Sequence, residues 1–384
     1  LNLSELRRKN SFFLFGPRGV GKSSLIRESL KEEALVINLL RASYSNRLLR
    51  SPSELEEIID GASGPKKIVV IDEVQKVPAL LDEVHRLIEE RGIRFLLTGS
   101  SARRLKSSGV NLLAGRAWIA HLFPLIYREI GAQEFDLDRY LRFGSLPAVW
   151  FSEDPLEQLD AYVQTYINEE IKSEGAVRKL PAFVDMLRSA ALSNGKIIQY
   201  SKIARDAGVS PPTVASYYEI LEDTLLGFQL HPWKGSRNRK AIASSKFYFF
   251  DPGVVNALAG TEHVERNSQL YGDLFEQFIA IELQAFMSYA RRKDALYFWR
   301  TESGIEVDFL IDKHVAIEVK ATRKVQMEDL KGLQALRLEG AAKHYVLVSQ
   351  DPVERMVDEI ECMPWQSFLS RLWQGSWFLP SGNT

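Results

Sequence analysis

Short apolar runs recur through the first third of the chain, within residues 11–15, 34–38, 67–73 and 94–101. Uninterrupted aliphatic runs are typical of strands buried on both faces of a parallel sheet. A fifth run, at residues 117–125, is stopped by Pro124, which cannot donate to a strand ladder. Apolar residues 80, 81, 84, 87 and 88 have the spacing of a helix with one buried face, and Ser53 with Glu56 matches a capping box. The pattern predicts an α/β domain with a parallel sheet over residues 1–125.

The middle of the chain has helical spacing instead. Residues 156–171 and 181–192 carry apolar side chains three and four positions apart, which predicts a helical lid over residues 126–190. Residues 201–221 then predict two short helices around a turn at Gly208, with Ser210 as the N-cap of the second helix. With two apparent strands after them, residues 191–255 have the pattern of a winged helix-turn-helix. One of these strands lies within residues 246–253 and ends in a turn; we assign it no chemistry.

The last third alternates between helix and strand patterns. Residues 270–289 predict one long amphipathic helix, and residues 295–300, 305–311 and 315–320 predict three strands. Because successive strand residues point to opposite faces, Glu306 and Asp308 share a face of one strand, and Glu318 and Lys320 share a face of the next. We expect residues 256–384 to form a second α/β domain.

The composition limits the function classes. The 384 residues are 45% apolar and 26% charged, which is typical of a soluble globular protein with about two to four domains. The net charge of −1 gives no global attraction to nucleic acid, so any basic surface must be local. The single cysteine, Cys362, excludes a disulfide framework and a cysteine-based zinc site and favours a reducing cytoplasm. We expect no membrane partner and no leader, because no apolar run is long enough to cross a bilayer and the start is not signal-like.

One motif carries specific chemistry. Residues Gly16-Pro-Arg-Gly-Val-Gly-Lys-Ser23 fit G-x-x-x-x-G-K-[ST] between an expected strand and an expected helix. Its glycines let the backbone curl so that N–H groups point at phosphate oxygens, and the helix adds its positive N-terminus. Lys22 would reach the β- and γ-phosphates of ATP, and the Ser23 hydroxyl would ligate Mg²⁺. A Gly-rich turn without a ligand is the alternative. The expected nucleotide contacts are Gly16, Pro17, Arg18, Gly19, Val20, Gly21, Lys22, Ser23 and Ser24.

Two carboxylates, Asp72 and Glu73, stand at the C-terminal end of the third apolar run. Open α/β sheets bind their ligands at this edge. Asp72 would hold Mg²⁺ through water, and Glu73 would orient or deprotonate the water that attacks the γ-phosphate. A solvated turn after a strand is the alternative, and the phosphate loop upstream favours the catalytic interpretation.

Hydroxyl residues end the fourth run, and an arginine precedes the fifth. Thr98, Ser100 and Ser101 are candidates for the side chain that senses the γ-phosphate, and we take Ser100 as a nucleotide contact. A hydroxyl-capped turn is the alternative. Arg116 is either a surface arginine or an arginine finger that reaches the γ-phosphate of a neighbouring copy. A homo-oligomer is expected only in the second case.

Together these motifs resemble the AAA+ superfamily, in particular ATPases of bacteria and archaea whose C-terminal halves carry a domain of unknown function with a nuclease-like fold. The resemblance implies ATP and Mg²⁺ as ligands and ATP hydrolysis as the activity. It also implies that the segment Gly144-Ser-Leu-Pro147 lies in the helical lid. The residues that carry the resemblance are 16–23, 69–75, 97–101, 113–116, 122–125 and 143–148.

The predicted winged helix offers a surface for DNA, with Thr213, Ser216 and Tyr217 facing outward from its second helix. This helix lacks the Arg, Lys, Asn and Gln side chains that are best suited to reading bases. A protein–protein module and a solvated basic loop are the alternatives. The basic side chains that would contact phosphates from a wing are Lys234, Arg237, Arg239 and Lys240.

A further constellation lies on the strand faces of the last third. Asp308 and Glu318-x-Lys320, with Glu276 from the preceding helix, resemble the PD-(D/E)XK nuclease pattern, although Val307 stands where that pattern has proline. The resemblance implies that Glu276, Asp308 and Glu318 bind Mg²⁺, which would polarise a phosphodiester and generate hydroxide, while Lys320 positions that water. A charged strand face, or a nuclease fold without activity, is the alternative.

The sequence therefore predicts an α/β multidomain protein with four parts. They are a P-loop ATPase core at residues 1–125, a helical lid at 126–190, a winged helix-turn-helix at 191–255 and a restriction-endonuclease-like domain at 256–384. The leading hypothesis is ATP binding and hydrolysis coupled to DNA binding, with metal-dependent DNA cleavage as a further activity. The contrasting hypothesis is a nucleotide-dependent switch in regulation or defence, whose last two parts bind partners without cleavage. A third is a plain NTPase whose C-terminal fold is only scaffold.

Overall fold

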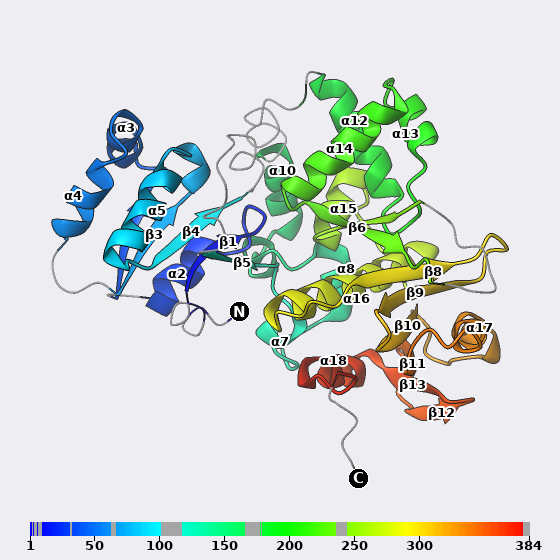
Figure 1. The fold of residues 1–384 in the computed structure, drawn as a ribbon. Coiled ribbons are helices and arrows are strands. Elements are labelled where there is room, and N and C mark those ends of the chain that lie inside the picture. The colour runs from blue at the N-terminus through cyan, green and yellow to red at the C-terminus, as the bar shows by residue number, and fades with distance from the viewer. Residues whose placement is uncertain are drawn as a thin grey trace, which may run out of the picture.

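The computed structural model describes residues 1, 3, 6, 10–30, 33–62, 67–100, 117–165, 177, 179–235 and 244–378. These residues form two β-sheets with helices around them, and Figure 1 shows the blue and cyan N-terminal sheet beside the green to red remainder. The long helix α16 (Gln269–Tyr289) contacts strands of both sheets and so joins the two parts. None of the helices in the described ranges combines the length and the apolar content needed to span a bilayer.

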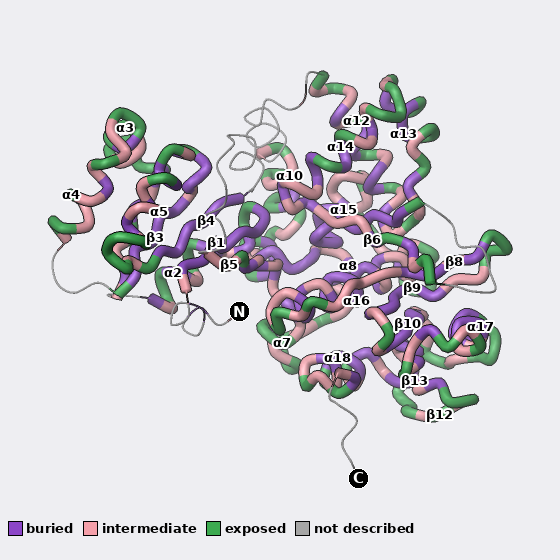
Figure 2. Tube along the Cα trace, in the orientation of Figure 1, coloured by how far each residue is buried: buried purple, intermediate pink, exposed green. Residues whose placement is uncertain are grey.

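The N-terminal sheet is parallel throughout, in the order β2-β3-β4-β1-β5. The three inner strands β3, β4 and β1 are buried at every residue, and Figure 2 draws them in purple. The prediction of a parallel sheet from uninterrupted apolar runs is therefore confirmed. The strands are β1 (Ser11–Phe15), β2 (Ala34–Asn38), β3 (Ile68–Asp72), β4 (Phe95–Gly99) and β5 (Ala117–His121).

Helices cover both faces of this sheet. Phe12 and Leu14 of β1 share a core with helix α2 (Lys22–Leu30), whereas Phe13 and Phe15 share the opposite core with helix α5 (Leu80–Arg91). Alternate residues of one strand thus pack against different helix layers, which explains why residues 12–15 are all apolar. Helices α3 (Ala42–Arg50) and α4 (Glu54–Asp60) each add a buried leucine to the α5 side.

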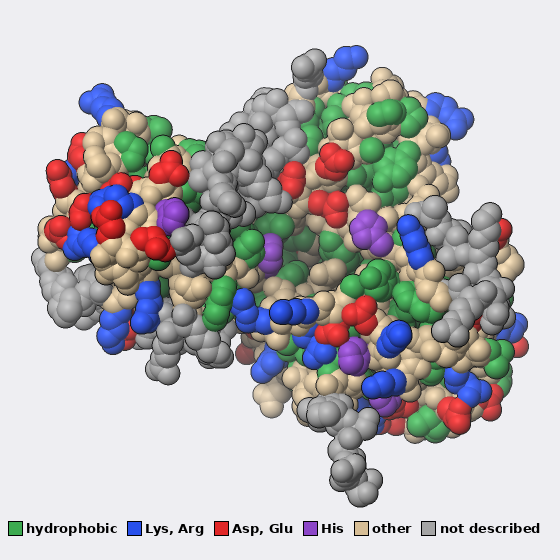
Figure 3. Space-filling view, in the orientation of Figure 1, with side chains coloured by type: hydrophobic (Ala, Val, Ile, Leu, Met, Phe, Trp, Pro, Cys, Tyr) green, Lys and Arg blue, Asp and Glu red, His purple; other side chains and the backbone are tan. Residues whose placement is uncertain are grey.

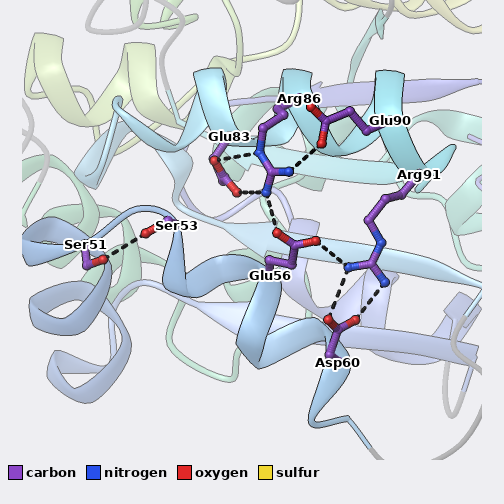
Figure 4. Close-up of polar contacts among 8 residues, drawn as sticks. All are labelled: Ser51, Ser53, Glu56, Asp60, Glu83, Arg86, Glu90 and Arg91. Carbon is purple, nitrogen blue, oxygen red and sulfur yellow. Dashed lines mark hydrogen bonds and ion pairs between the residues drawn. The ribbon is translucent and has the colours of Figure 1, made fainter.

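Arginine–carboxylate pairs attach α4 to α5 (Figure 4). Arg86 Nη2 lies 2.5 Å from Glu56 Oε2, and Arg91 Nη2 lies 2.7 Å from Asp60 Oδ1. The predicted capping box is wrong: Ser53 has helical backbone angles and its hydroxyl makes no cap hydrogen bond. The Glu56 carboxylate is bonded to arginines of another helix instead.

The middle of the chain is helical, as predicted. The helix predicted for residues 156–171 is described only as far as residue 165, because residues 166–176 lie outside the described ranges. The helices are α7 (Tyr127–Ile130), α8 (Leu137–Phe143), α9 (Pro147–Trp150), α10 (Pro155–Thr165) and α12 (Leu180–Leu192).

A helix pair and two antiparallel strands follow. Helix α13 (Tyr200–Asp206) precedes α14 (Pro211–Asp223), and the Ser210 side chain caps α14 by accepting a hydrogen bond from Thr213 N, as predicted. The expectation that Tyr217 faces outward is wrong, because its ring is buried edge-on against Phe183 with 5.0 Å between ring centroids. The assignment of this unit as a winged helix stays a prediction.

The strands after α14 belong to the second sheet, whose order is β12-β13-β11-β10-β9-β8-β6-β7. The predicted boundary between residues 255 and 256 therefore separates two segments that share one sheet and one helix, α15 (Pro252–Ala259). Two further helices, α17 (Lys331–Arg337) and α18 (Trp365–Gln374), pack on it. The strands are β6 (Gly227–Pro232), β7 (Lys246–Phe249), β8 (Leu296–Arg300), β9 (Glu306–Ile311), β10 (Val315–Lys320), β11 (His344–Ser349), β12 (Arg355–Val357) and β13 (Ile360–Pro364).

A buried carboxylate joins the helical lid to the turn after β7. Asp251 Oδ2 accepts a hydrogen bond from Ser145 N at 2.8 Å, and Oδ1 caps α15 by accepting one from Val254 N at 3.1 Å. Two glycines leave room for this contact. A Cβ atom on Gly144 would overlap the Asp251 carboxylate, and one on Gly253 would overlap the carbonyl oxygen of Phe143.

We expect Gly253→Ala to lower the free energy of unfolding by about 3 kcal/mol or more, because the new methyl group meets backbone that cannot move aside. Gly272→Ala in the first turn of α16 is the matched control, since a Cβ there has no neighbour within 4 Å. Helix propensity predicts that this control is unchanged or about 1 kcal/mol more stable. Urea unfolding of the two variants measures the difference, and equal midpoints would contradict the close approach at Gly253.

A second buried carboxylate holds the junction between the two parts. Glu282 of α16 accepts hydrogen bonds from Tyr127 N of α7 at 2.6 Å and from Trp373 Nε1 of α18 at 3.1 Å. Burial raises the pKa of Glu282 to about 7, although the two hydrogen bonds oppose this shift. The contact thus depends on a carboxyl group that titrates near neutral pH.

We expect Glu282→Gln to gain stability relative to the wild type as the pH rises. The folded-state pKa lies above the ordinary value of 4.5, so unfolding releases a proton between these values and the wild type loses stability through this window. The variant cannot ionise. Its stability relative to the wild type should therefore increase by about 3 kcal/mol between pH 4.5 and pH 7.5. Urea unfolding at several pH values tests this, and a difference that does not vary with pH would refute the shifted pKa.

Candidate functional site

The loop between β1 and α2 has the backbone geometry that phosphate binding requires. Gly19 and Gly21 have φ angles of 82° and 91°, which L side chains rarely adopt. A Cβ atom on Gly16 would lie 2.5 Å from the carbonyl oxygen of Leu122, just after β5. The loop stands at the C-terminal edge of the parallel sheet and at the N-terminus of α2, where unpaired helix N–H groups favour an anion.

Lys22 is buried and places its charge inside this loop. Its ammonium donates to the carbonyl oxygens of Gly16 at 2.6 Å and Pro17 at 2.9 Å. Of the other predicted contacts, Val20 is buried, whereas Arg18 and Ser24 are exposed. The loop residues thus fit a bound phosphate chain.

The helical lid lies against the loop. The ring of Pro147, the first residue of α9, is 3.7 Å from the position that a Cβ atom of Gly21 would take. The ring of Tyr162 from α10 is 3.4 Å from the corresponding position of Gly19. Pro147, the last residue of the segment Gly144-Ser-Leu-Pro147, thus lies against the phosphate loop. The assignment of these helices as a lid stays a prediction.

The Asp72 carboxylate collects three hydrogen bonds at the end of β3. Oδ2 accepts from Ser23 Oγ at 3.1 Å and from Asn38 Nδ2 at 3.3 Å, and Oδ1 accepts from Thr98 Oγ1 at 2.5 Å. Mg²⁺ at nucleotide sites takes one or two protein oxygens together with phosphate oxygens and water. The pairing of the Ser23 hydroxyl with a carboxylate fits that ligand set.

Glu73 follows Asp72 in a left-handed backbone conformation, with φ 63° and ψ 46°. This conformation is uncommon for a residue other than glycine and marks strain that often accompanies function. Gln75 Nε2 donates to Glu73 Oε2 at 2.6 Å and to Ser100 Oγ at 3.3 Å. The carboxylate of Glu73 is therefore held by a side chain two residues further on, in the short 3₁₀ helix η2 (Val74–Lys76).

The hydroxyl residues of β4 have different contacts. Thr98 is fully buried and bonds both Asp72 and the backbone N–H of Glu73, whereas Ser100 bonds Gln75. Ser101 and Arg116 lie outside the described residues, so their predicted roles are not placed. Sequence reasoning missed Asn38 and Gln75. The only sequence signal for Asn38 is that it is a polar residue at the end of an apolar run. The only signal for Gln75 is that it is a polar residue two positions after Glu73.

A cavity of about 670 Å³ borders the loop on the side of β5 and α16. Its walls include the first two loop residues, apolar side chains such as Phe228 and Phe250, and the cations of Arg291, Arg292 and Lys293. Figure 3 shows a hollow with hydrophobic side chains between the N-terminal part and the rest. An occupant would contact both the phosphate loop and the C-terminal end of α16.

The residues of the nuclease-like pattern come together in a second, separate cluster. Glu276 of α16, Asp308 of β9 and Glu318 of β10 are joined there by Glu306 of β9, and Lys320 Nζ lies 2.6 Å from Glu318 Oε1. Burial raises the pKa of Glu318 to about 7, and burial with the charges of Glu276 and Glu318 raises that of Asp308 well above its usual range.

Lys246, the first residue of β7, lies in the middle of this cluster. Its Nζ is 2.5 Å from Glu306 Oε1, 3.0 Å from Glu276 Oε1 and 3.7 Å from Asp308 Oδ1. Burial disfavours its charge, yet the surrounding groups raise the pKa of Lys246 well above its usual value, so it is protonated. Sequence reasoning missed this lysine, because nothing in its own segment indicates the acidic partners.

The cluster does not fit a divalent metal while this ammonium stands among its carboxylates. Within the described ranges, no three His, Cys, Asp or Glu side chains are arranged to hold a metal ion. The role of Glu276, Asp308 and Glu318 as Mg²⁺ ligands stays a prediction. Of the basic wing residues only Lys234 is described, as an exposed side chain; Arg237, Arg239 and Lys240 lie outside the described residues.

Three segments of the chain match known domain families. Residues 8–131 match the AAA domain, residues 134–265 match a domain of unknown function (DUF8612), and residues 271–368 match another (DUF4143). The N-terminal resemblance to AAA-type ATPases and the C-terminal domain of unknown function are thereby confirmed. The resemblance to PD-(D/E)XK nucleases stays a prediction.

The similar proteins have no assigned role. The chain is 28% identical over 332 residues to uncharacterized proteins of Mycobacterium bovis and Mycobacterium tuberculosis, which covers 83% of this chain and 71% of each relative. An uncharacterized protein of Methanocaldococcus jannaschii is 24% identical over 328 residues, or 78% of this chain and 71% of that protein. The similarity thus spans bacteria and archaea and extends beyond the AAA domain.

Proposed function

We propose that the chain is an ATPase that binds ATP with Mg²⁺ at the phosphate loop and hydrolyses it. The observation that carries this proposal is the hydrogen-bonded chain from Ser23 through Asp72 to Thr98, which ends at the backbone N–H of Glu73. It fixes the two carboxylates beside a phosphate loop of the required geometry. The match of residues 8–131 to the AAA domain supports the same activity.

Each residue has a distinct task in this proposal. The loop N–H groups and Lys22 bind the phosphates, and Glu73 accepts the proton of the attacking water or orients it. Ser23 and Asp72 would hold Mg²⁺, which neutralises the charge on the β- and γ-phosphates when bound. Pro147 and Tyr162 lie against Gly21 and Gly19 and would cover one side of the bound phosphates.

For the remaining parts, the Lys246 contacts favour the nucleotide-dependent switch over DNA cleavage. A nuclease site needs its carboxylates for metal, and here they surround an ammonium. DNA binding stays a proposal. It is supported by two exposed side chains, Lys234 of the predicted wing and Ser216 of α14, and the hydrolysis assay below tests it. We propose regulation through partner binding, with ATP and ADP selecting between lid positions.

We expect Lys22→Ala to weaken ATP binding at least tenfold, because it removes the charge held inside the loop. Glu73→Gln should keep ATP affinity and lose about 10²–10⁴-fold in hydrolysis, which is the usual contribution of a general base. Phosphate release and nucleotide binding are measured with and without single- and double-stranded DNA. Unchanged ATP affinity in Lys22→Ala would refute the assignment. Stimulation by DNA would favour the DNA-coupled hypothesis over the switch.

We expect Gln75→Ala to lower kcat about tenfold with little change in KM, because Glu73 would lose the amide that orients its carboxylate. Lys76→Ala is the matched control, since Lys76 lies in the same 3₁₀ helix but is exposed, and it should match the wild type. A rise in KM at constant kcat would show that Gln75 serves binding and not the orientation of Glu73.

A further inference from the structure

The acidic cluster of the second sheet contains more carboxylates than a structural ion pair needs. Glu276, Glu306, Asp308 and Glu318 come from one helix and two adjacent antiparallel strands. Asp308 and Glu318 are only 5% exposed. Buried like charges at this density are costly unless cations balance them, so the identity of the cation determines what the cluster can do.

The described structure supplies the cations from the chain itself. Lys246 contacts Glu276, Glu306 and Asp308, Lys320 contacts Glu318, and Arg300 Nη1 lies 2.6 Å from Glu306 Oε2. Lys246 differs from the other two because its side chain is only 4% exposed, against 38% for each of them. It is therefore the interior cation, whereas the other two lie at the solvent edge.

The surroundings of Lys246 hold it in place. The Tyr248 hydroxyl donates to Glu276 Oε1, the same oxygen that faces Lys246 Nζ, and the Tyr248 ring lies 6.0 Å from that of Phe309. Asp308 Oδ2 is already bonded to Val319 N at 2.8 Å. A metal ion could use these oxygens only by displacing the Lys246 ammonium, whose side chain is only 4% exposed.

One oxygen of the cluster is still available. Glu318 Oε2 is buried and has no hydrogen-bond partner within the described ranges, although Oε1 pairs with Lys320. A buried carboxylate oxygen without a partner is a ligand that an added hard cation would use. It is independent of the Lys246 contacts. Because no three carboxylates of the described residues are arranged to hold a metal ion, a metal would bind here only after Lys246 is removed and the carboxylates shift toward it.

We propose that Lys246 is the resident cation of a latent divalent-cation site formed by Glu276, Asp308 and Glu318, and that it keeps this site closed. The C-terminal domain then retains the carboxylates of a metal-dependent enzyme but uses them to bind β7. This inference does not depend on the ATPase activity, because the cluster and the phosphate loop share no residue.

Mn²⁺ titration followed by electron paramagnetic resonance tests the proposal. All proteins carry Asp72→Asn and contain no nucleotide, which removes the candidate metal ligand of the ATPase part. The Asp72→Asn protein and the Asp72→Asn/Asp308→Asn protein should bind the same amount of Mn²⁺. Lys246→Met, which lacks the ammonium but keeps the unbranched side chain up to the position of Cε, should gain an additional Mn²⁺ ion per chain that is lost in Lys246→Met/Asp308→Asn. Lys320→Met is the matched control and should gain none.

Two Mn²⁺ results would overturn the proposal. One is an Mn²⁺ ion that depends on Asp308 while Lys246 is intact. The other is a folded Lys246→Met protein, with a cooperative thermal transition, that gains no Mn²⁺. The first comparison needs no Lys246 variant, so it remains decisive if Lys246→Met does not fold. Plasmid cleavage by the wild type that is abolished in Asp308→Asn would overturn it as well, whatever the ATPase assays give.

Discussion

The contact between the Asp251 carboxylate and the backbone of the lid is the constraint on which the rest of the arrangement depends. A buried carboxylate is costly unless hydrogen bonds satisfy it, and burial raises the pKa of Asp251 to about 6. The N–H groups of Ser145 and Val254 offset this cost, and Asn256 adds two bonds to the carbonyl oxygens of Leu141 and Arg142. The lid is thereby fixed over the phosphate loop by residues about a hundred positions later in the chain.

The backbone geometry of the candidate nucleotide site could be predicted because it depends on local sequence. Gly19 and Gly21 have the positive φ angles that their spacing in the loop suggests, and apolar runs predict inner strands because helices cover both faces. The helix cap at Ser210 is confirmed for the same reason, since a cap involves residues within one turn. In each case the sequence neighbours are also the spatial neighbours.

The errors and omissions involve partners that are distant in the sequence. Glu56 matched a capping box, but its carboxylate bonds Arg86 and Arg91 of α5 instead. Tyr217 was expected to face outward, but Phe183 of α12 covers it. Two strands, β8 and β6, lie between the strands of Lys246 and Asp308 in the order of the sheet, yet Lys246 Nζ is 3.7 Å from Asp308 Oδ1. No local pattern encodes such contacts.

These distant contacts meet in β7. Its first residue, Lys246, is held by carboxylates of the second sheet, and Asp251, which holds the lid, follows two residues after its end. At a rise of about 3.3 Å per residue, the two anchors are roughly 17 Å apart along an extended backbone. Between these two anchors β7 is buried at every residue and pairs with β6 along its length. A different lid position that displaced Asp251 would therefore require either that β7 moves with it or that the buried Asp251 contact breaks.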